Sequence, residues 1–149
     1  MRNPDRWVID ASVAAKWYLR DEDLLPQADQ VLRSIPFAGS TAPYIIRHEV
    51  ANSLSAAVRS ARISRSDAEG SLAHFLRSDL GTQPDPESVI QHALGITIDL
   101  SIYIMDAVYI ALAQQIGFQF VTADAKLYRA ISGRRPDVRW LGDVPIPDR

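Results

Sequence analysis

The segment WVIDAS, residues 7–12, gives the clearest indication of the fold class. Its three apolar residues are followed at once by Asp10, which is typical of a short buried parallel strand that ends in a polar residue. Two similar segments, 118–121 and 138–141, lie far downstream, and a weaker one lies near 39–42. The sequence therefore predicts a sheet of short buried strands.

Helical patterns fill the intervals between these strands. Apolar residues recur at three- and four-residue steps, and Pro43 stands near the expected start of one helix. The expected helices cover residues 13–20, 24–35, 43–59, 64–77, 86–100, 101–116 and 124–131. Strands that alternate with helices predict a parallel α/β sandwich, in which ligands bind beyond the carboxyl ends of the strands.

The composition excludes several classes of protein. The 149 residues are expected to form one domain, 1–149, with enough apolar residues to bury a core. Cysteine is absent, which excludes disulfide scaffolds, thiolate metal sites and cysteine nucleophiles. The sequence has no apolar run as long as a membrane span and no signal-peptide pattern, so we expect a cytoplasmic protein. Its net charge of −2 argues against a protein that coats nucleic acid through bulk charge.

Four acidic residues stand out because they lie beside apolar segments. Asp10 and Asp124 each follow a predicted strand, whereas Glu49 and Asp106 lie within largely apolar helical patterns. Each also has a purely structural interpretation. In that interpretation Asp10 or Ser12 caps the helix after the first strand, and Thr122 or Asp124 caps the helix after the second. Asp106 would then cap a helix that starts at that residue, and Glu49 would face solvent.

Taken together, the four carboxylates predict a metal site. If their ends of the sheet coincide, they form one acidic pocket in which each carboxylate raises the pKa of the others. A divalent cation removes that repulsion. A donor set made only of oxygen atoms favours Mg²⁺ or Mn²⁺ over zinc, and such ions typically act on phosphate esters.

At these residues the sequence resembles the PIN domain family, in particular the small VapC-type ribonuclease toxins of bacterial toxin–antitoxin pairs. Four segments carry the resemblance in the family's order: VIDASVAAKWYL (8–19), PYIIRHEVANSL (43–54), MDAVYIALAQQIG (105–117) and VTADAKL (121–127). The chain departs from the family at Met105, where an aromatic residue is frequent, and in segment 81–100, where no strand is recognisable.

The resemblance implies a fold and a chemistry. The fold is a three-layer α/β/α sandwich around a mainly parallel sheet of four to five strands. The activity is that of a Mg²⁺-dependent (or Mn²⁺-dependent) endoribonuclease toxin with an RNA substrate, a cognate antitoxin and a homodimeric state. The implied residues are the catalytic quartet Asp10, Glu49, Asp106 and Asp124, the metal ligands Asp10, Asp106 and Asp124, and the supporting Ser12, Thr122 and Asn52.

Basic residues near these motifs are candidates for contacts with the RNA backbone, although each also fits ordinary surface charge. They are Lys16, Arg20, Arg47, Lys126 and Arg129. The antitoxin is expected to place an amphipathic helix in an apolar groove and a basic side chain near the quartet. The residues suggested for that groove are Trp17, Leu24, Leu25 and Val31.

Two other functions compete with the nuclease. An aspartyl-nucleophile phosphatase also places an aspartate at the end of a strand, but it normally has a second aspartate two positions later, where this chain has Ser12. A non-catalytic interaction module with the same fold is the other alternative, and it has no need for four carboxylates.

Overall fold

The computed structural model describes residues 6–135 and 137–148, which form five strands, seven α-helices and two 3₁₀ turns. In chain order these elements are β1 (Trp7–Ile9), α1 (Ala11–Ala14), η1 (Ala15–Trp17), α2 (Leu25–Ala38), β2 (Thr41–Pro43), α3 (Ile46–Arg59), α4 (Arg65–Leu76), β3 (Gly81–Gln83), α5 (Glu87–Leu100), α6 (Ile104–Ile116), β4 (Gln119–Thr122), α7 (Ala125–Ile131), β5 (Val138–Trp140) and η2 (Leu141–Asp143).

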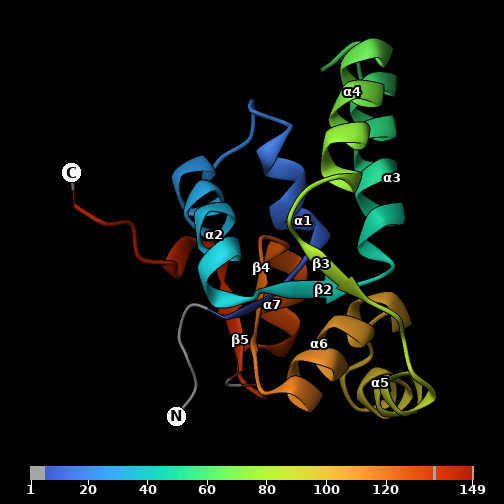
Figure 1. The fold of residues 1–149 in the computed structure, drawn as a ribbon. Helices are drawn as coiled ribbons and strands as arrows, with labels where there is room; N and C mark the ends of the chain where they lie inside the picture. The colour runs from blue at the N-terminus through green and yellow to red at the C-terminus, as the bar shows by residue number, and fades with distance from the viewer. Residues whose placement is uncertain (1–5, 136, 149) are drawn as a thin grey trace.

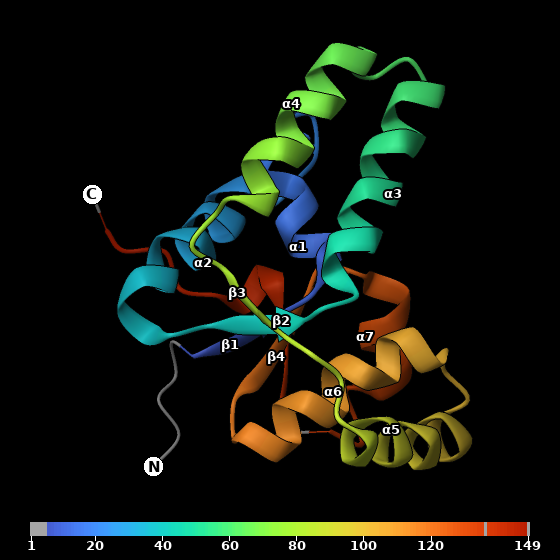
Figure 2. The ribbon, with the colours of Figure 1, turned by 45° about the vertical axis from the view of Figure 1, so that its right-hand side comes forward.

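The five strands form one parallel sheet in the order β3-β2-β1-β4-β5. The chain moves outward from β1 through β2 to β3, and then returns across β1 to β4 and β5. Because crossovers between parallel strands are right-handed, this reversal places α1–α4 on one face of the sheet and α5–α7 on the other (Figures 1 and 2). The predicted three-layer α/β/α sandwich is confirmed.

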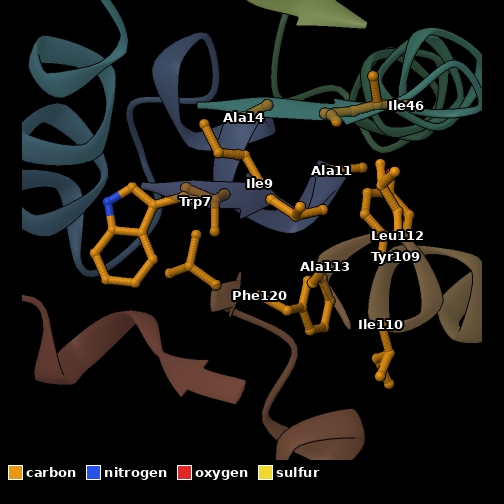
Figure 3. Close-up of a cluster of buried hydrophobic side chains, with 14 of the residues drawn as sticks. Trp7, Ile9, Ala11, Ala14, Ile46, Tyr109, Ile110, Leu112, Ala113 and Phe120 are labelled. Carbon is orange, nitrogen blue, oxygen red and sulfur yellow. The ribbon is translucent and has the colours of Figure 1, made fainter. Parts of the chain in front are cut away.

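The two central strands, β1 and β4, are buried on both faces. Val8, Ile9, Phe120 and Val121 are fully inaccessible, which explains their continuous apolar character. Figure 3 shows Ile9 and Phe120 within the same cluster as Tyr109 and other residues of α6. The hydrophobic core therefore fixes β1 and β4 at the centre of the molecule.

The register between β1 and β4 determines which polar residues meet. Ile9 is paired with Val121, and the amide of Asp10 donates to the carbonyl of Val121 at 3.0 Å. Asp10 and Thr122 consequently lie side by side where both strands end. This is the point at which the strand order reverses, and parallel sheets bind ligands there.

Several element boundaries differ from the prediction. The helix expected over 43–59 begins at Ile46, because Pro43 is the last residue of β2 and is paired with Gln83 of β3. The helix expected over 13–20 is divided into α1 and η1, and the helix expected over 101–116 begins at Ile104.

Among the described residues, no single helix is long and apolar enough to cross a bilayer. Only α5 and α6 taken together reach that length and apolarity, and they are separated by a bend of 117°.

Candidate active site

Asp10 is held at the end of β1 by two hydroxyl groups. The hydroxyls of Ser12 and Thr122 both donate to its Oδ2, at 2.6 Å and 2.8 Å. Its side chain makes no capping bond to α1, and only 6% of the residue is exposed. Asp10 thus occupies the N-cap position of α1, but its carboxylate accepts from the two hydroxyls and does not cap the helix.

The same two hydroxyls connect Asp10 to the start of α7. Ser12 Oγ accepts from the amide of Ala123 at 2.9 Å, and Thr122 Oγ1 accepts from the amide of Asp124 at 3.0 Å. Asp124 in turn caps α7, accepting from the amide of Leu127 at 3.0 Å. The capping interpretation of Asp124 is thus confirmed, and the cap fixes this carboxylate near the end of β4.

Glu49 lies in the first turn of α3 and is half-buried, which contradicts the solvent-facing interpretation. Its Oε1 accepts a hydrogen bond of 2.7 Å from the hydroxyl of Tyr109 on α6. Tyr109 is fully buried, so this bond forms in the interior between α3 and α6. Sequence reasoning missed Tyr109, although its position one turn after Asp106 on an apolar helix was visible.

Asp106 is the third residue of α6 and is half-buried. It is neither the helix cap nor deep within the helix, since α6 begins at Ile104 and Tyr103 is its N-cap. Asp106 and Asp124 line the same open cleft of about 470 Å³. The other residues that line this cleft are Ser101, Ile102, Tyr103, Lys126, Leu127 and Ala130.

The electrostatics link all four carboxylates. Burial raises the pKa of Asp10, and the negative charge of Asp124 raises it further, against the lowering effect of the two hydroxyl bonds. Burial raises the pKa of Glu49 to about 7 and that of Asp106 to about 6, and the charge of Asp10 contributes to both. Asp10, Glu49 and Asp106 therefore lie close enough to other members of the cluster for the neighbouring charges to disfavour their ionised states.

None of these four carboxylates takes part in an ion pair within the described part of the chain. The ion pairs there involve other acidic residues, namely Asp21, Glu22, Asp23, Asp29 and Glu69. Across residues 6–135 and 137–148, however, no three His, Cys, Asp or Glu side chains are grouped tightly enough to hold a metal ion as they stand. The acidic side chains expected to bind the metal thus lie in one region of the fold, but as they stand they are too far apart to coordinate one ion together.

The basic residues suggested for RNA contact have different surroundings. Lys16 is 5% exposed, and its ammonium group pairs with Asp23 at 3.0 Å and Glu22 at 3.4 Å. Arg20 pairs with Asp29 through two bonds of 2.8 and 2.9 Å. Lys126 lines the cleft beside Asp106 and Asp124.

The two remaining basic candidates and Asn52 lie at the surface. The guanidinium of Arg47 lies over the ring of Tyr44, 4.5 Å from its centroid, and bonds to the hydroxyl of that tyrosine. Arg129 is exposed in the last turn of α7, and Asn52 is exposed on α3. Among the five basic candidates, Lys126 is therefore the one that shares a cleft with the carboxylates.

Of the four residues suggested for the antitoxin groove, Val31 cannot line it, because it is fully buried in the core. Trp17, Leu24 and Leu25 are half-buried, and the indole of Trp17 donates to the carbonyl of Ala28 at 2.9 Å. An apolar groove of about 250 Å³ lies between α3 and α4. Its apolar lining is Ala51, Leu54, Val58, Ala68 and Leu72, and Arg59, Arg65 and Glu69 also border it.

Comparisons with known proteins agree with this fold. The family model described as PIN domain matches residues 7–131. Among solved structures, the chain is similar to one titled "Toxin-antitoxin complex from Klebsiella pneumoniae", with a TM-score of 0.59 and 16% sequence identity over 90% of this chain and 95% of that chain. A search of curated proteins finds no match.

Proposed function

The chain belongs to the PIN domain family, and from that premise we propose that it is a Mg²⁺-dependent endoribonuclease and the toxin of a toxin–antitoxin pair. The observation that carries the proposal is the cluster of Asp10, Glu49, Asp106 and Asp124. Three of these carboxylates have a raised pKa, and the charges of the cluster contribute to each shift. An uncompensated cluster of this kind costs stability, which is expected of a site built for a cationic ligand.

The donor set fits a hard divalent cation. Asp10, Asp106 and Asp124 would hold Mg²⁺ or Mn²⁺, because both ions prefer carboxylate oxygens. When bound, such an ion activates water and stabilises the charge that develops on a phosphodiester. The hydroxyls of Ser12 and Thr122 keep Asp10 in place for this role, since both donate to the same oxygen, Oδ2.

Glu49 is suited to a different task. Its pKa of about 7 lies near the pH at which a cytoplasmic enzyme works. A carboxylate with such a pKa accepts a proton from water more effectively than an exposed glutamate does. We therefore assign proton transfer to Glu49 and cation binding to the three aspartates.

The cleft has features that suit a single-stranded RNA. Lys126 places a positive charge beside the carboxylates, where a phosphate would need a counter-charge. Tyr103, which is 82% exposed, lines the same cleft and offers a ring on which a base can stack. RNA in the cytoplasm is accordingly the proposed substrate.

Two protein partners belong to the proposal. The α3–α4 groove is the proposed seat for an antitoxin helix, because its lining is apolar and its border carries both signs of charge. A second copy of the chain is proposed to cover the exposed apolar stripe of α5. Ile90, Leu94 and Ile98 recur there at four-residue steps and are 47%, 56% and 69% exposed.

The catalytic proposal is tested by cleavage of RNA with highly purified protein. We expect cleavage with Mg²⁺ or Mn²⁺, loss of cleavage in EDTA, and a loss of several orders of magnitude in Asp10→Asn. Asp79→Asn is the matched control, because it makes the same charge change at an exposed position between α4 and β3. Cleavage that persists in EDTA, or in Asp10→Asn at the rate of the wild type, would contradict the proposal.

A further inference from the structure

Three of the four carboxylates accept a hydrogen bond from a side chain or amide that holds them in place. Asp10 is held by two hydroxyls and Asp124 by the amide of Leu127. Glu49 has the longest side chain of the four and thus the most rotational freedom to lose. Oε1 of Glu49 accepts a hydrogen bond of 2.7 Å from the Tyr109 hydroxyl.

Tyr109 is well placed to act as a rigid donor. The residue is fully buried, and its ring packs against the ring of Phe120, with 5.6 Å between centroids and an interplanar angle of 38°. Figure 3 shows Tyr109 and Phe120 together in the core beneath β1. A buried aromatic ring has little freedom to move, so the position of its hydroxyl is set by the core.

The charges around Tyr109 keep its hydroxyl protonated. Burial raises the pKa of Tyr109 well above its ordinary value, and the negative charges of Asp10 and Glu49 raise it further. The group is consequently a hydrogen-bond donor throughout the neutral range, which is the form that a carboxylate acceptor needs.

We propose that Tyr109 is a positioning residue, which holds the Glu49 carboxylate at the active site through the hydrogen bond from its hydroxyl to Oε1. This inference rests on the proposed nuclease function and adds a residue to it. Tyr109 also lies one turn after Asp106 on α6, so a single helix supplies both an acidic ligand and the group that orients the acid on α3.

The test compares Tyr109→Phe with Tyr128→Phe. Phenylalanine at 109 keeps the ring that packs on Phe120 and removes only the hydroxyl. Tyr128 is the matched control, because it is half-buried on α7 and its ring packs against Trp140 with 5.7 Å between centroids. Loss of a hydrogen bond to a charged group predicts that kcat falls about 10- to 100-fold in Tyr109→Phe, with KM within about twofold of the wild type.

A second readout does not depend on activity. The chain has only four glutamates, Glu22, Glu49, Glu69 and Glu87, so carboxyl-carbon NMR of a glutamate-labelled sample gives four signals. The Glu49 signal is assigned by its loss in Glu49→Gln. We expect Tyr109→Phe to move this signal, because the carboxylate loses its hydrogen bond from the hydroxyl, and Tyr128→Phe to leave it in place.

The outcomes separate the inference from the function on which it rests. A Glu49 signal that does not move in Tyr109→Phe overturns the inference, whatever the activity. A signal that moves while kcat stays at the wild-type value overturns the positioning role. If the wild type cleaves no RNA but the signal moves, the nuclease proposal fails and the contact between Tyr109 and Glu49 stands. Tyr109→Phe is also expected to add no further loss of kcat to Glu49→Gln, because glutamine at 49 has already lost the acid whose position the Tyr109 hydroxyl sets.

Discussion

The substitution Asp106→Asn isolates the cost of placing negative charges together in this site. Burial and the charges of Asp10 and Asp124 raise the pKa of Asp106 from 3.8 to about 6. At 1.36 kcal/mol per pH unit, the ionised carboxylate then costs about 3 kcal/mol. Because Asp106 is only half-buried, screening by solvent reduces that figure to about 1 kcal/mol. The neutral amide of asparagine avoids this cost.

We therefore expect metal-free Asp106→Asn to be more stable than the wild type by about 1 kcal/mol at pH 7.5, or about 2–4 °C in Tm. The folded wild type binds more protons than the unfolded chain between pH 3.8 and about 6, so its stability falls as the pH rises through that window. The gain from the substitution is accordingly full above about pH 6, and about a third of it remains at pH 4.5.

Thermal and urea unfolding at pH 7.5 and 4.5 measure this difference, with Asp79→Asn as the control for the change in net charge. Mg²⁺ should raise the Tm of the wild type more than that of Asp106→Asn, because stabilisation by a ligand requires the intact site. A mutant that is less stable than the wild type at pH 7.5, or one whose gain is the same at both pH values, would refute the electrostatic argument.

Three further substitutions test individual contacts. Asp124→Ala should lose the cap of α7 and about 1 kcal/mol of stability, whereas Asp124→Asn should keep the cap, and RNA cleavage should be lost in both. Ser64→Ala should lose about 1 kcal/mol in urea unfolding without affecting cleavage, because the Ser64 hydroxyl accepts from the amide of Asp67 at the start of α4. Gly142→Ala should be destabilised by about 1–3 kcal/mol, since its Cβ would lie 2.5 Å from Trp140 Nε1. Gly133→Ala, where a Cβ meets nothing within 4 Å, should unfold like the wild type; equal stability of the two alanine variants would show that Trp140 moves aside freely.

The strands that sequence reasoning found are those whose side chains are buried. β1 and β4 have apolar residues because helices cover both of their faces. β3 was missed because Gly81 and Gln83 are exposed and the segment has no apolar residue. This edge strand is held by its backbone pairing with β2 and by the Thr41 hydroxyl, which donates to the carbonyl of Gly81 at 2.5 Å. Pairing of that kind leaves no hydrophobic pattern.

The acidic residues were found for a related reason, since a carboxylate beside apolar neighbours interrupts a regular pattern. Tyr109 gave no such signal, because a tyrosine in an apolar helix looks like an ordinary core residue. Lys16 was misleading in the opposite sense. Its closeness in sequence to Asp10 favoured a role in RNA binding, whereas the loop after η1 folds back and places Glu22 and Asp23 against its ammonium group. These contacts depend on the path of the loop and are visible only in the folded chain.

The reversal of strand order also has a consequence for the synthesis of the protein. β1 is made first, but one of its two neighbours in the sheet, β4, follows more than a hundred residues later. The acidic residues at positions 10, 49, 106 and 124 come from four separate segments. At about 5–20 residues per second, a ribosome needs about 4–15 s to proceed from Glu49 to Asp124. During that interval the growing chain lies beside messenger and ribosomal RNA without a complete catalytic centre. The order of the strands thus acts as a delay, and the proposed nuclease becomes able to cut only after Asp124 has been synthesised.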